Sequence, residues 1–138
     1  MTAKVMIVDD EPEVVRLLEV ILSREGFAVI KACSGQECLM LLRQQSPDVI
    51  VLDNMMPGMS GVEVMHSLQL MYKAITLPPV VFLSAKGGMD AMVEGLQAGA
   101  YKYLVKPTSR EKLVEVVRAA AEFGENKRHP PVQPPDWM

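Results

Sequence analysis

Acidic, hydroxyl and amino side chains follow apolar runs at four places in this chain. Asp9 and Asp10 follow the first of these runs, and Asp53 follows a later one. Ser84 closes a third run, and Lys106 comes directly after a fourth. Carboxylates that crowd together repel one another unless a cation neutralises them, and oxygen ligands of this kind suit Mg²⁺. If the four places meet in space, the chain has the groups that bind a divalent cation and a phosphate.

The apolar runs alternate with segments of helical periodicity. The pattern predicts strands at 4–8, 27–32, 48–52, 79–83 and 101–105. It predicts helices at 12–25, 34–44 and 60–72, a fourth from Met89 that ends at Gly99, and a last helix capped by residues 108–111. Buried strands that alternate with amphipathic helices indicate an α/β fold with a parallel sheet covered on both faces. Right-handed crossovers then make a doubly wound sheet the simplest arrangement.

Polar residues at the carboxyl ends of such strands are the candidates for function, because ligands bind there in doubly wound sheets. Each residue also has an ordinary explanation. Asp10 could cap the first helix, and Asp53 could belong to the turn before Pro57. Ser84 could be a plain strand-end hydroxyl, and Lys106 a solvated charge. Their joint placement at one edge of the sheet favours a shared site.

Four sequence blocks together resemble the signature of response-regulator receiver domains. They are Val-Asp-Asp-Glu-Pro at 8–12, Val-Leu-Asp-Asn-Met-Met-Pro-Gly-Met-Ser-Gly at 51–61, Leu-Ser-Ala at 83–85 and Gly-Ala-Tyr-Lys-Tyr-Leu-Val-Lys-Pro at 99–107. The resemblance extends in order from about residue 4 to residue 123. It implies a flavodoxin-like fold with five helices and a five-stranded parallel sheet in strand order 2-1-3-4-5.

The resemblance also implies a role for each acid. Asp53 would accept a phosphoryl group from the phosphohistidine of a sensor histidine kinase, from a phosphotransfer protein or from a small phosphodonor. Mg²⁺ would be held by Asp10, by Asp53 and by the backbone carbonyl of Met55, with Asp9 acting through a water molecule. The chain would be a signalling switch that catalyses only its own phosphorylation and dephosphorylation.

The remaining site residues would hold the phosphoryl group and report its presence. Lys106 would pair with one phosphoryl oxygen, and the Lys106–Pro107 peptide is expected to be cis. Ser84 would donate a hydrogen bond to another oxygen and move toward it, while Tyr103 turns inward behind it. Equally, Tyr103 could be a half-buried aromatic residue of the strand that has no role in the switch. Such a switch follows the general logic in which a new charge biases a bistable element.

The expected output face consists of the fourth helix, the fifth strand and the last helix. An unidentified downstream protein would bind there, and dimerisation through the same face on phosphorylation is left open. Tyr101 and Lys102 replace the acidic pair that is common in the family, which changes the charge of this face. Met55 and Lys86 occupy positions that tend to set the lifetime of the phosphoryl group.

Particular residues argue against three other functions. A phosphatase of the haloacid-dehalogenase type needs a second acid two residues after its nucleophile, where this chain has Met55. A flavodoxin-like cofactor binder needs a hydroxyl- or glycine-rich loop after the first strand, where residues 9–11 are acidic. A degenerate receiver used only for docking is disfavoured because all the residues that the chemistry needs are present.

Composition and charge limit the remaining possibilities. The 138 residues carry a formal net charge of -3 and no large basic cluster, which predicts no direct contact with nucleic acid. No apolar stretch is long enough to span a bilayer. Cys33 and Cys38 match no metal motif, which favours reduced thiols in a cytoplasmic protein. We expect a receiver domain at 1–124 and a tail or linker stub with four prolines at 125–138.

Overall fold

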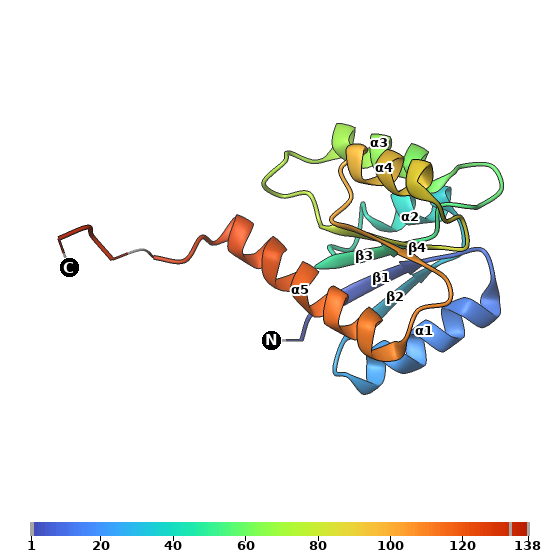
Figure 1. Ribbon diagram of the computed structural model, residues 1–138, viewed down its shortest axis with the longest axis horizontal. Helices are drawn as coiled ribbons and strands as arrows, with labels where there is room; N and C mark the ends of the chain where they lie inside the picture. Colours follow the sequence, from blue (N-terminus) through green and yellow to red (C-terminus); the bar gives the residue numbers. More distant parts are fainter. Residues whose placement is uncertain (1, 133, 138) are drawn as a thin grey trace.

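The computed structural model describes residues 2–132 and 134–137, and within them five strands alternate with five helices (Figure 1). The strands are β1 (Lys4–Val8), β2 (Ala28–Ala32), β3 (Val49–Leu52), β4 (Val80–Ser84) and β5 (Lys102–Val105). The helices are α1 (Pro12–Arg24), α2 (Gly35–Leu41), α3 (Gly61–Met71), α4 (Met89–Gln97) and α5 (Arg110–Arg128). All strand pairs are parallel, in the order β2-β1-β3-β4-β5. The predicted fold class and strand order are therefore confirmed.

The sheet is the middle of three layers. Helices α1 and α5 cover one face, and α2, α3 and α4 cover the other (Figure 1). Each face has its own cluster of buried apolar side chains. The cluster under α2, α3 and α4 includes Phe82, and the cluster under α1 and α5 includes Leu22. Every residue of β3 and β4 is buried, as the continuous apolar runs of a doubly covered parallel strand require. This rigid centre fixes the strand ends from which the polar residues project.

Side-chain caps begin two of the helices that flank the polar edge. The Ser60 hydroxyl accepts a hydrogen bond from the backbone N–H of Glu63, and the Glu63 carboxylate accepts one from the N–H of Ser60. This reciprocal pair starts α3 as the sequence predicts. At α5, however, the cap is Ser109, whose hydroxyl accepts from the N–H of Lys112. The prediction that the cap begins at Thr108 is one residue too early.

The last helix also continues beyond Gly124, where the predicted tail begins. It ends at Arg128. The Lys127 amine donates to the Leu77 carbonyl at 2.9 Å, and Arg128 lies 3.7 Å from the carboxylate of Asp48. These contacts with the body of the domain hold the final turn in place, so the extended segment begins four residues later than the composition indicates. That segment then leads away from the domain (Figure 1).

Among the described helices, none combines the length and the apolar character that a membrane crossing requires.

Candidate phosphorylation and metal site

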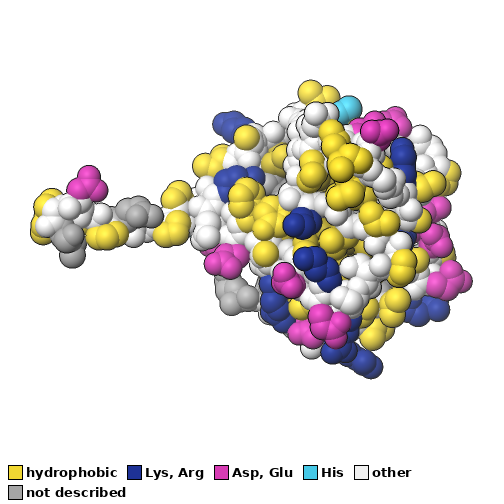
Figure 2. All heavy atoms as spheres, viewed as in Figure 1, with side chains coloured by type: hydrophobic (Ala, Val, Ile, Leu, Met, Phe, Trp, Pro, Cys, Tyr) yellow, Lys and Arg dark blue, Asp and Glu magenta, His cyan; other side chains and the backbone are white. Residues whose placement is uncertain are grey.

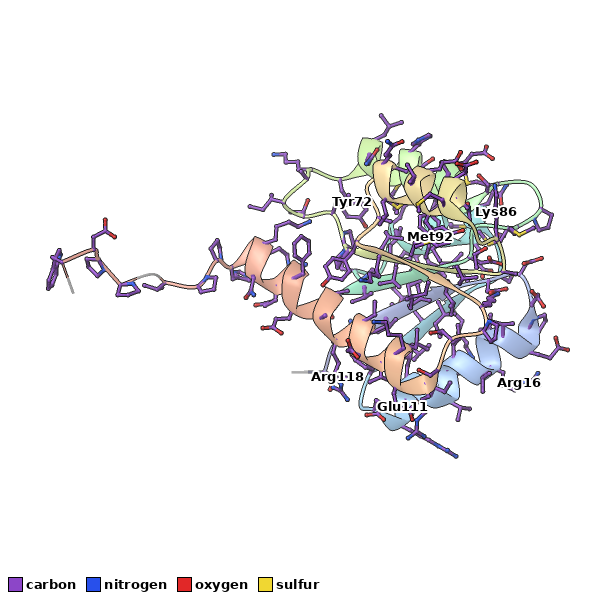
Figure 3. All side chains as sticks on the ribbon, viewed as in Figure 1. Arg16, Tyr72, Lys86, Met92, Glu111 and Arg118 are labelled. Atoms are coloured by element: carbon purple, nitrogen blue, oxygen red, sulfur yellow. The ribbon has the colours of Figure 1, made fainter. Side chains whose placement is uncertain are left out.

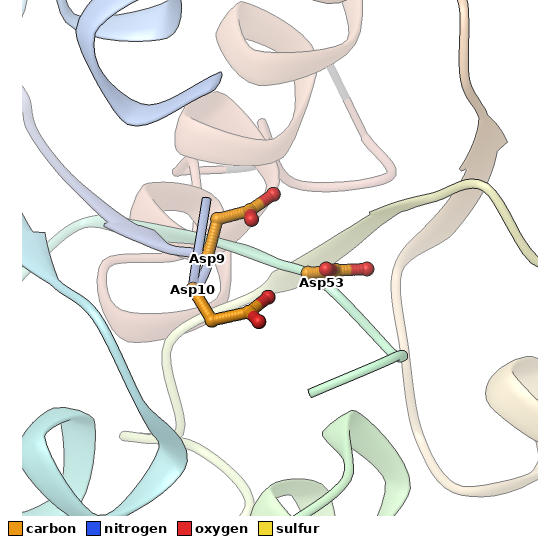
Figure 4. Close-up of side chains that lie close together, drawn as sticks. All are labelled: Asp9, Asp10 and Asp53. Atoms are coloured by element: carbon orange, nitrogen blue, oxygen red, sulfur yellow. The ribbon is translucent and has the colours of Figure 1, made fainter. Parts of the chain in front are cut away.

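Three carboxylates meet where β1 and β3 end. One oxygen from each of Asp9, Asp10 and Asp53 lies within 4.8 Å of the others (Figure 4). The sheet register explains the meeting, because β1 and β3 are paired neighbours and the backbone N–H of Asp53 donates to the carbonyl of Val8 at 2.9 Å. Asp9 and Asp53 are only 2% and 4% exposed, whereas Asp10 is exposed to solvent. The predicted acidic cluster is therefore present in the fold.

Lys106 supplies the cation that faces these acids. Its amine lies 2.8 Å from a carboxylate oxygen of Asp9 and 3.9 Å from one of Asp53. The residue follows β5, and its backbone N–H donates to the carbonyl of Ser84 at 2.8 Å. The Lys106–Pro107 peptide bond is cis, as expected. The ammonium group of Lys106 thus lies beside two of the three carboxylates.

Ser84 and Tyr103 are connected through the backbone of one residue. Ser84 is fully buried at the end of β4, and its hydroxyl accepts a hydrogen bond from the N–H of Lys86 at 3.2 Å. The carbonyl of Lys86 accepts a 2.7 Å hydrogen bond from the Tyr103 hydroxyl. Tyr103 is 4% exposed and its ring lies 5.3 Å from that of Phe82, so the side chain is buried and not half-buried.

The loop after β3 is held by residues that the sequence patterns did not single out. The side-chain oxygen of Asn54, a buried residue, accepts from the N–H of Val62 at the start of α3. Gly61 allows close approach here, because a Cβ at this position would lie 2.7 Å from the carbonyl oxygen of Asp53. Both residues lie within the block at 51–61, so their place in this block after Asp53 was the available signal.

The protonation of Asp53 reflects its crowded position. Burial raises the pKa of this carboxyl above its usual value, and the negative charge of Asp9 raises it further. The N–H of Met55, which donates to Asp53 at 3.2 Å, acts in the opposite direction, as do Lys106 and Ser84. The net shift is upward because the effect of burial outweighs these opposing contacts.

Lys106 shows the complementary effect. Burial lowers the pKa of its amine, but the hydrogen bond to Asp9 and the charges of Asp53 and Glu11 raise it more, so the net shift is upward. The amine is therefore charged at neutral pH. Together with the carboxylates it forms a site that attracts a divalent cation and can bind an anionic oxygen.

Comparison with known proteins identifies relatives along most of the chain. The chain is 38% identical over 115 residues to the Mycobacterium tuberculosis protein described as "Probable transcriptional regulatory protein TcrX". It is 35% identical over 127 residues to "DNA-binding response regulator MtrA" of Mycolicibacterium smegmatis. The two alignments cover 83% and 92% of this chain.

The same alignments cover only 48% of the first relative and 54% of the second. The chain thus spans about half the length of these relatives. Because their names describe transcriptional regulation and DNA binding, the expectation that this chain makes no direct contact with nucleic acid is not confirmed and stays a prediction.

Structural comparison and a family match agree with this relationship. The fold resembles the chemotaxis protein CheY4 of Vibrio cholerae with a TM-score of 0.78 and 30% sequence identity, over 87% of this chain and 99% of that one. Residues 5–118 match the response regulator receiver domain. That range contains the acids, the serine and the lysine described above. This chain therefore belongs to the family of response regulator receiver domains, the signalling domains of two-component systems.

Proposed function

We propose that the domain is a phosphorylation switch whose acceptor is Asp53. The observation that carries this proposal is the position of the Asp53 carboxylate, which is buried among two further acids and lies 3.9 Å from the amine of Lys106. An isolated acid at this depth would be costly to retain. A role as a nucleophile beside a cation would explain why a carboxylate is buried here despite this cost.

Mg²⁺ fits the donor set of this site. Asp10, Asp53 and the backbone carbonyl of Met55 would hold the ion, and Asp9 would reach it through water. Hard oxygen donors in this number suit Mg²⁺, which keeps several waters and binds through one or two carboxylates. When bound, the ion neutralises negative charge on the acids and on phosphoryl oxygens.

Phosphoryl transfer would begin with a carboxylate oxygen of Asp53 attacking the phosphorus of a kinase phosphohistidine. An O–P bond forms, the N–P bond breaks, and the imidazole nitrogen keeps the electron pair and takes up a proton. Such transfer depends mainly on in-line positioning and on neutralisation of charge. The Lys106 amine would exchange the Asp9 carboxylate for a phosphoryl oxygen, and the Ser84 hydroxyl would donate to another.

Loss of the phosphoryl group would be catalysed by the domain itself. Water would attack the phosphorus, and the acyl phosphate would return to the Asp53 carboxylate and inorganic phosphate. Met55 is 56% exposed and lies in the loop between β3 and α3, and Lys86 lies in the loop that follows Ser84; both line one pocket. Their side chains would set how easily water reaches the phosphorus.

The signal would leave through α4, β5 and α5. Ser84 and Tyr103 would respond to the phosphoryl group, and the face beside them would change its affinity for a downstream protein or a second copy. Figure 2 supports an interaction role, since hydrophobic side chains gather on this side with Lys and Arg among them. The exposed apolar residues of α4, β5 and α5 are Met89, Val93, Leu96, Val105 and Phe123.

We also propose where the domain acts in the cell and where it ends along the chain. A domain that takes its phosphoryl group from a histidine kinase would act in the cytoplasm. The receiver unit would end near the end of α5, and the proline-containing segment that follows would serve as a tail or as a linker to a further domain. In that case nucleic-acid binding would belong to the attached domain.

Acetyl phosphate tests the acceptor directly. With Mg²⁺ and acetyl phosphate, intact mass spectrometry should detect one phosphoryl adduct on the wild-type chain and none on Asp53→Asn. Asp48→Asn is the matched control, because Asp48 is an acid at the other end of the sheet, and it should keep the adduct. An adduct that persists in Asp53→Asn would refute the assignment.

A further inference from the structure

Gly95 lies in the interior of α4 at the point where this helix crosses Tyr103. A Cβ at residue 95 would lie 2.7 Å from Cδ2 and 3.1 Å from Cε2 of the Tyr103 ring, and 3.3 Å from Cδ2 of Phe82. The shortest of these distances is below any contact that a real Cβ makes, so a side chain here and the ring cannot both keep their places. Glycine weakens a helix interior relative to alanine, which makes its presence in α4 a cost that the contact offsets.

Tyr103 is also held from a second direction. Its hydroxyl donates to the carbonyl of Lys86. Lys86, labelled in Figure 3, lies in the loop between β4 and α4. Gly95, in contrast, meets the edge of the same ring from within α4. One aromatic side chain therefore touches both the loop that follows Ser84 and the helix that this loop leads into.

We propose that Gly95 is a positioning residue. Because it has no side chain, it leaves a space, the seat, that the inward Tyr103 ring occupies, and the residue at 95 sets the balance between the inward and outward positions of that ring. The inference rests on the proposed role of Tyr103 as the switch aromatic and adds the element that controls it. A larger residue at 95 disfavours the inward position without touching the acidic site. The ring position and the position of α4 then depend on each other.

The ring position is measured by fluorine NMR on protein that contains 3-fluorotyrosine. The Tyr103 resonance is identified by its absence in Tyr103→Phe, which separates it from Tyr72 and Tyr101. In the wild type, a soluble gadolinium chelate should broaden this resonance least, because the ring is buried. In Gly95→Ala the same resonance should shift and broaden strongly. Gln97→Ala, an exposed position of the same helix, should leave it unchanged.

Urea unfolding gives a second readout that general damage to packing would not produce. Gly95→Ala should lower the urea midpoint in the wild-type background, where the ring occupies the seat. In a Tyr103→Ala background the seat is empty, so the same substitution should raise the midpoint through its better helix propensity. If Tyr103→Ala does not fold, Tyr103→Leu serves in the same comparison.

Two results would overturn the inference. One is a Tyr103 resonance that stays protected in Gly95→Ala. The other is a change of urea midpoint with the same sign in both backgrounds, which would mean that Gly95 only packs α4 against the sheet. Neither measurement uses a phosphodonor, so failure here is separate from failure of Asp53 as the acceptor. Gly95→Ala should still form the acetyl phosphate adduct.

Discussion

The two edges of the sheet carry charged residues in opposite circumstances. At the carboxyl edge, Asp9 and Asp53 are buried and share the amine of Lys106. At the amino edge, a carboxylate oxygen of Asp48 accepts from the backbone N–H of Lys4 at 2.7 Å, and Arg128 lies 3.7 Å away with a side chain that is 25% exposed. Acids and cations are present at both edges, but only at the carboxyl edge are two of the acids, Asp9 and Asp53, withdrawn from water.

This difference separates the contribution of charge to function from its contribution to stability. Exposed ion pairs in water contribute roughly 0–1 kcal/mol each. Burial raises the pKa of Asp53, so its ionised carboxylate opposes folding. The buried acids of the carboxyl edge therefore lower stability, which the proposed ion and phosphate site would explain, and the amino edge is nearly neutral.

Removal of the buried cation should have the largest effect on stability. Lys106→Met leaves Asp9 and Asp53 facing each other without the amine that now lies 2.8 Å from Asp9. Breaking a buried pair costs roughly 3–5 kcal/mol, and because Lys106 is one-fifth exposed we expect about 2–3 kcal/mol. Urea unfolding near neutral pH with EDTA measures this loss. Lys112→Met, which removes an exposed partner of Glu115, is the control and should change little. Equal losses in both variants would contradict the comparison.

Neutralisation of the acceptor should have a smaller effect of opposite sign. The folded-state pKa of Asp53 lies above its unfolded value, so the ionised carboxylate opposes folding at pH values above the folded pKa. Asp53→Asn should therefore raise the urea midpoint of the Mg²⁺-free protein at neutral pH. The gain should shrink as the pH falls through the folded pKa and disappear below about 4, the ordinary pKa range of Asp, because the wild-type carboxyl is then protonated in both states. A gain that is constant with pH would argue against burial of charge as its cause.

At the amino edge, loss of an ion pair should have the smallest effect. Arg128→Ala removes the contact with Asp48 and should cost less than about 1 kcal/mol, since both side chains are partly exposed. The cost should decrease further in high salt because salt screens exposed pairs. Thermal unfolding at two salt concentrations tests this prediction. A loss as large as that of Lys106→Met would show that the two edges do not differ as proposed.

Patterns along the chain were enough to predict the elements and the place of the site. Short, continuous apolar runs such as Val49–Leu52 predict strands that are buried on both faces, and this run is buried at every position. Parallel pairing then brings their ends together, so Asp9 and Asp53 had to meet once β1 and β3 became neighbours. The clustering of acids is thus a consequence of local pattern plus strand order.

Features that depend on tertiary contact could not be predicted in this way. The end of α5 depends on the bond from Lys127 to the Leu77 carbonyl, 50 positions away in the chain. The burial of Tyr103 depends on the space beside Gly95, which nothing near Tyr103 in the sequence reveals. The chemical roles of the site residues rest on the family resemblance and stay predictions until they are tested.

The bond between Lys106 and Asp9 joins residues 97 positions apart, and this separation matters while the chain is being made. Synthesis proceeds from the amino terminus, so the acids of β1 and β3 leave the ribosome well before the lysine that faces them. A chain interrupted before β5 has Asp9 and Asp53 but lacks the Lys106 amine that lies beside them. If Asp53 accepts the phosphoryl group as proposed, competence to receive it would therefore arise only with the completed sheet.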